Sequence, residues 1–206
     1  MSILGNDLLL GSGDEGYNLT RSLRFRSSAS AYLNRTPASA GNRQIFTLSA
    51  WVKRGTLGAR QGIIVCTDAP ANNYFDIEFI AADQLDIQGS NGTWRLTTSA
   101  VYRDPSAWYH IVLAVDTTQA TASNRVKLYV NGSQVTAFST ASYPTLNSNC
   151  YFNLNAAHSI GSWQPASGLY FDGYLTEVNF IDGQALTPSS FGSTNTLTGV
   201  WQPARY

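Results

Sequence analysis

The chain has 206 residues and carries 13 basic and 13 acidic side chains, so its formal net charge is zero. No excess of basic residues indicates binding to nucleic acid or to an anionic membrane, and we expect neither partner. Charged residues make up only 13% of the chain, which is typical of extracellular or particle-bound β proteins that rely on Ser, Thr, Asn and Gln for solubility. Its length allows one large domain that buries roughly 70% of its unfolded surface.

The first 20 residues mix Gly, Ser, Asn and Asp around one apolar run, Leu8, Leu9 and Leu10, and follow neither the helical nor the strand period. Two interpretations stay open. The stretch is an arm that docks onto another subunit through the three leucines, or a frayed terminus whose leucines pack on their own domain. It has no basic segment and no long apolar run, so we expect neither a signal peptide nor a membrane span.

The remaining chain consists of short strand patterns, and no segment of helical length has the helical period. Ile45–Arg54 alternates apolar and polar residues, so one of its faces must belong to a core. Trp108–Asp116 is apolar on both faces and is expected at the centre of a sheet. Further strands are expected at 22–27, 31–34, 63–66, 74–80, 84–88, 93–97, 125–130, 134–137, 150–154, 159–161 and in the first half of 170–192.

Local signals refine this pattern in the second half of the chain. Asn131-Gly132 supplies the positive φ angles of a tight turn and predicts a hairpin. In the closing stretch, 170–192, the apolar alternation shifts by one residue, which predicts a β-bulge at Thr176 or Glu177. Residues 188–191 are expected to form at most a single helical turn.

More than ten short strands, separated by Gly, Asn and Pro turns, predict an all-β fold, a two-sheet sandwich or jelly roll. We divide the chain into an N-terminal arm (1–20), a jelly-roll domain (21–192) and a C-terminal extension (193–206). Cys66 and Cys150 are too few for a disulfide scaffold or a zinc site. We expect two buried thiols, and a single bridge is the alternative.

Four stretches together resemble the laminin-G-like branch of the concanavalin A-like lectin and glucanase superfamily. They are SLRFRSSASAYLNRT (22–36), FTLSAWVKRG (46–55), WYHIVLAVD with RVKLYVNG (108–116 and 125–132) and FDGYLTEVNFIDGQALTPSSFG (171–192). Their order and spacing match that family along residues 22–192. The last stretch, with the ending TGVWQPARY, is similar to the version found in proteins of tailed bacteriophages, in fibres or on the particle surface. The resemblance implies an all-β, antiparallel two-sheet jelly-roll sandwich and a virion setting.

Sugar binding needs an aromatic platform beside amide or carboxylate groups. The candidates for carbohydrate binding are Trp94 beside Asn91, and Trp163 with Gln164 near Tyr170, because they lie in or next to predicted loops. Rim packing or contact with another subunit is the alternative role for both tryptophans. Trp51 and Trp108 lie in predicted strands and are interpreted as packing residues.

Lectins and laminin-G-like domains hold calcium at a rim through carboxylates and backbone carbonyls. One loop of this chain offers Asp68, Asn72, Asn73 and Asp76 as metal ligands. The family's calcium pattern is not reproduced, and ordinary turn formation is the alternative explanation for these residues. We therefore expect no obligatory cofactor, with calcium as the alternative.

Catalysis is the third possible class of function, because glucanases share the superfamily fold. Asp76 and Glu78 lie two apart in a predicted strand and so share a face, as the carboxyl pair of a retaining glycosidase must. The Glu-x-Asp-x-x-Glu pattern of those enzymes is absent, and His110 lies in a central strand as a core or edge residue. We expect no enzymatic activity and no catalytic residues.

Three functional hypotheses follow from the resemblance. The preferred one is a structural virion protein of a tailed phage, such as a head decoration or tail-associated protein, docked on other virion proteins through Leu8, Leu9 and Leu10. Its homo-oligomer is a trimer by hypothesis. The second is a receptor-binding tail fibre or tip module that recognises host surface glycans, and the third is a glycan hydrolase. The expected location is the virion surface after assembly in the host cytoplasm.

Overall fold

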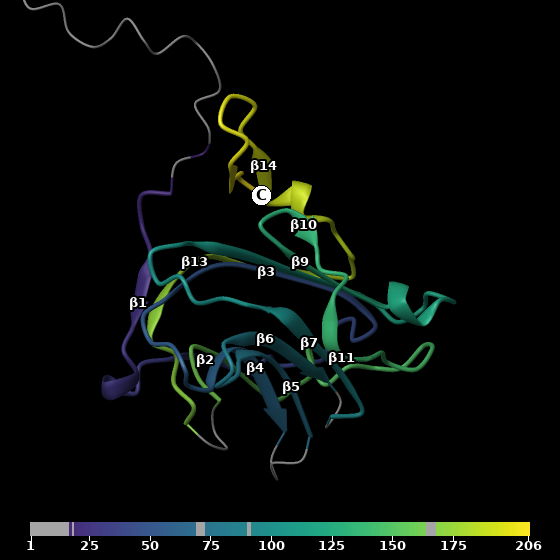
Figure 1. Cartoon of the computed structure of the whole chain (residues 1–206). Coiled ribbons are helices and arrows are strands. Elements are labelled where there is room, and N and C mark those ends of the chain that lie inside the picture. The colour runs from purple at the N-terminus through teal and green to yellow at the C-terminus, as the bar shows by residue number, and fades with distance from the viewer. Residues whose placement is uncertain (1–16, 18, 69–72, 90–91, 164–167) are drawn as a thin grey trace, which may run out of the picture.

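The computed structural model describes residues 17, 19–68, 73–89, 92–163 and 168–206, and it consists of two large antiparallel β-sheets packed face to face (Figure 1). Sheet A, the upper sheet in Figure 1, has six strands. In spatial order they are β1 (Leu23–Phe25), β13 (Gly173–Asp182), β3 (Ile45–Arg54), β8 (Tyr109–Asp116), β9 (Val126–Val130) and β10 (Ser133–Gln134). The closing strand β13 therefore lies between two of the earliest strands.

Sheet B, the lower sheet in Figure 1, has seven strands. In spatial order they are β11 (Phe138–Ser142), β7 (Trp94–Val101), β6 (Gln84–Gly89), β5 (Asn73–Phe79), β4 (Gln61–Asp68), β12 (Ala157–Ile160) and β2 (Leu33–Arg35). A separate two-stranded ribbon pairs β14 (Gly192–Thr194) with β15 (Trp201–Pro203). The predicted all-β, two-sheet antiparallel sandwich is confirmed.

The helical content of the described residues is limited to three 3-10 turns, η2 (Ser27–Ala29), η3 (Ala122–Asn124) and η4 (Pro188–Ser190). The last of these is the single turn expected near residue 188. Within the part of the chain that the structure describes, no helix has the length and apolar character needed to cross a membrane.

The core fills the space between the inner faces of the two sheets. Phe46 from sheet A contacts Phe75 from sheet B with ring centroids 6.0 Å apart, and Phe152 stacks on Phe46 at 5.4 Å. All three rings are at most 4% exposed. Each contributing strand directs alternate residues inward, as strand geometry requires, so the opposite residues of every strand are left for the outer faces.

Three local predictions are confirmed. Strand β8 lies between β3 and β9, and its residues from His110 to Val115 are buried on both faces. In β13 the pairing register with β3 shifts between Thr176 and Asn179, and Glu177 takes a positive φ of 47°. This is the bulge that the shift in apolar alternation predicts, and both cysteines are buried free thiols as expected.

Other segments differ from the expectation. Residues 150–154 form an irregular segment that places Phe152 in the core. Strand β11, which has the sequence FSTAS and mostly exposed side chains, was not predicted, since its pairing with β7 is made by the backbone and has no apolar signature. The C-terminal residues contain the β14–β15 ribbon, which packs against the outer face of sheet A through Trp201.

Candidate functional site

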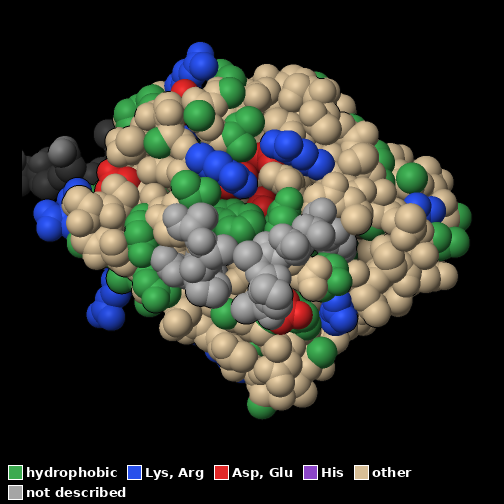
Figure 2. All heavy atoms as spheres, turned by 90° about the horizontal axis from the view of Figure 1, so that it is seen from below, with side chains coloured by type: hydrophobic (Ala, Val, Ile, Leu, Met, Phe, Trp, Pro, Cys, Tyr) green, Lys and Arg blue, Asp and Glu red, His purple; other side chains and the backbone are tan. Residues whose placement is uncertain are grey.

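The outer face of sheet B carries an unusual set of polar residues at its centre. In β5, Phe75, Ile77 and Phe79 belong to the core, so the alternate residues point outward. The same alternation holds along β6 and β7. Figure 2 views the molecule from this side and shows basic side chains lying beside acidic ones in the middle of the face. We call this the polar face, and it comprises Arg60, Tyr74, Asp76, Glu78, Asp86, Gln88, Arg95, Thr97 and Trp163.

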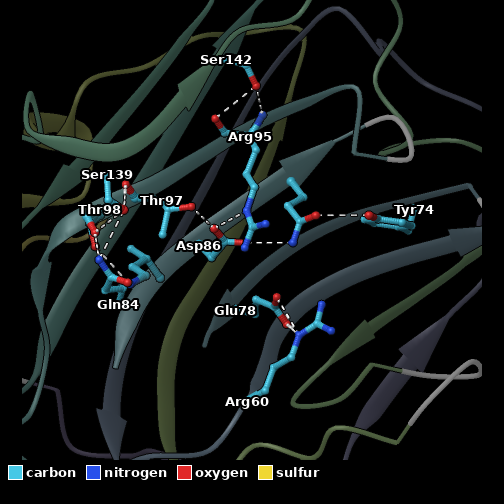
Figure 3. A network of polar contacts seen from close by, with 12 residues as sticks. Arg60, Tyr74, Glu78, Gln84, Asp86, Arg95, Thr97, Thr98, Ser139 and Ser142 are labelled. Carbon is cyan, nitrogen blue, oxygen red and sulfur yellow. Dashed lines mark hydrogen bonds and ion pairs between the residues drawn. The ribbon is translucent and has the colours of Figure 1, made fainter. Parts of the chain in front are cut away.

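Two arginines cover two buried carboxylates on the polar face. Arg60 donates Nε–H to both oxygens of Glu78, at 2.9 and 2.8 Å. Arg95 donates Nε–H to Oδ1 of Asp86 at 2.9 Å (Figure 3). The carboxylate side chains are fully buried, whereas the arginine side chains are 45% and 39% exposed. Because Glu78 and Asp86 are direct partners in the β5–β6 register, the two ion pairs are neighbours.

Asp86 is the most heavily hydrogen-bonded acid of the cluster. The Thr97 hydroxyl also donates to its Oδ1, and Gln88 donates Nε2–H to Oδ2 at 2.8 Å. Gln88 in turn accepts a hydrogen bond from the Tyr74 hydroxyl at 3.1 Å. The resulting network, drawn in Figure 3, runs across β5, β6 and β7 and fixes the position of Arg95.

Asp76 is the exception among these acids. It is fully buried, and neither of its carboxyl oxygens has a hydrogen-bond partner among the described residues. Burial, followed by the charges of Glu78 and Asp86, raises the pKa of Asp76 well above its usual range. The carboxyl group of Asp76 is therefore held toward its neutral, protonated form.

Trp163 covers the polar face at the level of β4 and β5. Its ring centroid lies 5.0 Å from that of Tyr74, and the Arg60 guanidinium lies 5.6 Å from its ring. Gly62 faces Glu78 in the register, and a Cβ at Gly62 would come within 3.1 Å of the Trp163 ring. The indole N–H of Trp163, which is 7% exposed, also has no partner among the described residues.

Asp76, Glu78 and Asp86 could in principle share a metal ion, because one carboxyl oxygen of each lies within 4.8 Å of the others. The donor set fits a hard cation poorly. Both oxygens of Glu78 are taken by Arg60, and both oxygens of Asp86 accept hydrogen bonds. A calcium ion needs six to eight free oxygen ligands and is repelled by adjacent guanidinium groups.

The predicted calcium ligands do not form a described cluster. Asp68 and Asn73 face each other at the ends of β4 and β5, whereas Asp76 points into the acidic cluster of the polar face. Asn72 lies outside the described residues.

The predicted sugar-binding residues are dispersed. Trp163 lies on the polar face, whereas Tyr170 packs beside Tyr32 with ring centroids 6.2 Å apart. Trp94 is 1% exposed in the core, where its ring packs against Phe75 and fills the space left by Gly89. A glycan at the surface has no access to Trp94. Asn91, Gln164, Leu8, Leu9 and Leu10 lie outside the described residues.

Most of the polar face was missed as a site. A signal was present in the polar residues that alternate with apolar ones along three successive strands, Asp76-x-Glu78, Asp86-x-Gln88 and Arg95-x-Thr97. The alternation marks the acid pair of the first strand as sharing a face, and the same reasoning extends to the other two strands. Tyr74 continues the alternation of Asp76 and Glu78 along β5, whereas Arg60 precedes β4 and has no such pattern.

His110 is buried on the opposite side of the sandwich and belongs to a separate arrangement. Its ring lies between Trp51, at 4.7 Å, and Trp201, at 5.9 Å, in stacked geometry. The Ser49 hydroxyl lies 2.9 Å from its Nε2. Burial lowers the pKa of His110 to about 4, so the imidazole is neutral at pH 7. The expectation of a packed histidine agrees with these contacts.

Comparison with known proteins identifies a family. Residues 27–190 match the model of the family described as the concanavalin A-like lectin/glucanases superfamily. A search of curated proteins finds no match to this sequence.

Solved structures share the fold at low sequence identity. The heptameric SAP-like pentraxin from Limulus polyphemus aligns with a TM-score of 0.54 at 15% identity, over 84% of this chain and 76% of the pentraxin. Domains LG4-5 of the mouse laminin alpha1 chain align with a TM-score of 0.53 at 12% identity, over 77% and 40% of the two chains.

A third structure is domain 4 of AbnA, a GH43 extracellular arabinanase from Geobacillus stearothermophilus, in complex with arabinotriose. It aligns with a TM-score of 0.50 at 21% identity, over 72% of this chain and 65% of that chain. The chain thus covers less than two thirds of the laminin and arabinanase structures. At these identities the likeness shows the fold alone.

Proposed function

Because this chain belongs to the concanavalin A-like lectin/glucanase superfamily, we propose that it is a non-enzymatic carbohydrate-binding domain whose ligand lies on the polar face. The observation that carries the proposal is the group of partly exposed side chains that meet on this face. The Arg60 and Arg95 guanidinium groups are anchored on buried carboxylates, and the half-buried Tyr74 ring lies beside Trp163.

Sugar hydroxyls both donate and accept hydrogen bonds, so they can pair with guanidinium N–H groups and with the Tyr74 hydroxyl. The exposed parts of Arg60 and Arg95 and the half-buried Tyr74 offer the surface on which a sugar would rest. The arabinotriose in the AbnA domain 4 structure is consistent with this class of ligand.

A binding role is favoured over hydrolysis by the state of the two acids on β5. Retaining hydrolysis needs a free nucleophilic carboxylate and an acid on opposite sides of the scissile bond. Glu78 gives both oxygens to Arg60, and Asp76 and Glu78 are both fully buried. Neither is placed to attack a sugar.

We propose in addition that the domain works on the surface of a tailed-phage particle, where it would contact host glycans. The support is the resemblance of residues 171–192 and of the ending TGVWQPARY to phage proteins. In this proposal the arm attaches the domain to other virion proteins through Leu8, Leu9 and Leu10.

We also propose that the protein forms a homo-oligomer, with a trimer as the hypothesis. Leu33 and Phe180 are 49% and 40% exposed beside a groove of about 630 Å³, and such apolar exposure favours self-association.

The carbohydrate proposal is tested on a glycan array with the wild-type protein and with Tyr74→Ala and Trp163→Ala. We expect binding by the wild type and its loss in both variants. Trp108→Ala is the matched control, because Trp108 is a partly exposed aromatic residue that lines a groove on the far side, with Trp51. Absence of binding to every glycan, or equal binding by all variants, would overturn the proposal.

The particle location is tested by mass spectrometry and gold labelling of purified virions. Deletion of residues 1–20 should abolish incorporation while leaving the melting temperature of the purified domain unchanged. Normal incorporation of the deleted protein would contradict the docking arm.

A further inference from the structure

Arg60 and Arg95 each use only one edge of the guanidinium group for a contact within the protein. Each uses Nε–H for its buried carboxylate, and no hydrogen bond from a terminal Nη group of either residue is present among the described residues. The side chains are 45% and 39% exposed. Because Nε makes the carboxylate contact in both residues (Figure 3), the Nη groups of two guanidinium forks remain available to a ligand.

The forks are fixed before any ligand arrives. Arg60 rests on the Trp163 ring, and Arg95 is tied to an acid that also accepts hydrogen bonds from Thr97 and Gln88. An arginine that is already ordered loses little side-chain entropy on binding. The two anchors, Glu78 and Asp86, are direct cross-strand partners, so the two guanidinium groups belong to adjacent positions on the face.

The charges of the polar face also admit an anion. Two arginines balance Glu78 and Asp86, and the third acid, Asp76, has no cation of its own. With Asp76 held toward its neutral form, the face carries no excess negative charge. A planar carboxylate matches the fork of a guanidinium through two parallel hydrogen bonds.

We infer that the ligand of the polar face is a carboxylate-bearing glycan, such as one built from uronic acids, whose carboxylate is bound by the Nη groups of Arg60 and Arg95 while its ring lies against Tyr74 and Trp163. This inference rests on the proposed carbohydrate-binding function and adds the chemical class of the sugar. Sulfated glycans are a second anionic class. A sulfate group would be attracted by the same two arginines, but it lacks the planar geometry that matches a guanidinium group.

The test compares three tetrasaccharides by calorimetry at low salt: tetragalacturonate, neutral tetragalactose and a sulfated tetragalactose. We expect tetragalacturonate to bind at least about tenfold more tightly than the neutral probe, and to weaken as salt is raised. Arg60→Gln and Arg95→Gln should each lower the affinity for tetragalacturonate about tenfold or more, and by a larger factor than they lower the affinity for the neutral probe.

Arg103→Gln is the matched control, because Arg103 makes the same kind of contact, Nε–H to Asp83 Oδ2 at 2.9 Å, with a side chain that is 60% exposed away from the polar face. Removing Arg60 alone leaves Glu78 buried without its cation, so the double variant Arg60→Gln/Glu78→Gln keeps the charge balance if the single variant misfolds. It should show the same loss of affinity as the folded single variant.

Three results would overturn the inference. Equal affinity for the neutral and the uronate probe, with binding lost in Trp163→Ala, refutes the anionic class and retains the carbohydrate-binding function. Binding of the sulfated probe alone refutes the carboxylate. Failure of all three probes and of a wider glycan array refutes both the class and the function.

Discussion

Trp201 donates its indole N–H to Nδ1 of His110 across 2.9 Å, although the two residues are 91 positions apart in the sequence. The bond requires an unprotonated Nδ1, and the same ring is stacked between Trp201 and Trp51. The C-terminal ribbon β14–β15 is thus fastened to sheet A by a neutral histidine.

This contact predicts an acid-sensitive stability. The pKa of His110 is about 4 in the folded chain and 6.5 in its unperturbed state, so the unfolded chain binds more protons between these values. The free energy of unfolding should therefore fall as the pH drops from about 6.5 to about 4, by roughly 3 kcal/mol, and level off below. Urea titrations of the wild type and of His110→Asn should show the steeper fall in the wild type alone. Parallel pH profiles for the two proteins would contradict the prediction.

The buried carboxyl group of Asp76 should make stability depend on pH in the opposite sense to His110. Its raised pKa means that the folded chain binds more protons than the unfolded chain above pH 3.8, so its contribution to stability declines as the pH rises through the folded pKa. Asp76→Asn imitates the neutral acid. It should melt a few degrees above the wild type at pH 8, since about 1 kcal/mol moves the midpoint of a domain of this size by 2–4 °C, and the gap should close near pH 4. A variant less stable than the wild type at pH 8 would mean that Asp76 is ionised and paired.

Calcium should leave the melting temperature unchanged. The acids of the polar face have their oxygens committed to Arg60, Arg95 and Gln88, apart from those of Asp76. Thermal melts with about 5 mM chelator and with about 5 mM calcium, a concentration suited to a weak extracellular-type site, should coincide. A midpoint that rises with calcium and returns with chelator would restore a metal site.

Gly89 makes room for Trp94 in the core. A Cβ at this position would overlap the Trp94 ring, so Gly89→Ala should cost about 3 kcal/mol in the free energy of unfolding. Gly183→Ala is the comparison, because Gly183 has a φ of 75° and no atom near its Cβ position. In Gly183→Ala the only cost is the left-handed backbone conformation, which should lower the free energy of unfolding by about 1 kcal/mol. Equal losses in the two variants, measured by denaturant titration, would show that Trp94 does not occupy this space.

The two-sheet fold could be predicted because the alternation of apolar and polar residues along a strand shows which side chains are buried. The alternation of β3, the doubly apolar β8 and the shifted register at Glu177 each follow from side chains that must face one core. The inward position of Trp94 was also readable, since it shares a face with Leu96, but its neighbouring Asn-Gly turn favoured a loop interpretation. Strand β11 was not readable, because its pairing involves the backbone.

The polar face was only partly accessible for a different reason. Which residues meet there depends on the registers between strands and on a shift in the β4–β5 pairing between Gly62 and Ile64. Arg60 lies just before β4, outside the paired residues, so strand alternation does not link it to Glu78. The contact of Trp163 with Tyr74 is likewise set by packing between residues 89 positions apart, beyond any local pattern.

The bulge in β13 has a consequence for orientation. It presents Glu177 to the hydroxyl of Tyr17, which donates to it at 3.0 Å, and Tyr17 lines a groove with Trp51 and Trp108 on the outer side of sheet A. The described chain therefore enters the domain on the side opposite the polar face. An attachment made upstream of Tyr17 and a sugar bound on sheet B would not compete for surface, so one molecule could be tethered and engaged at the same time.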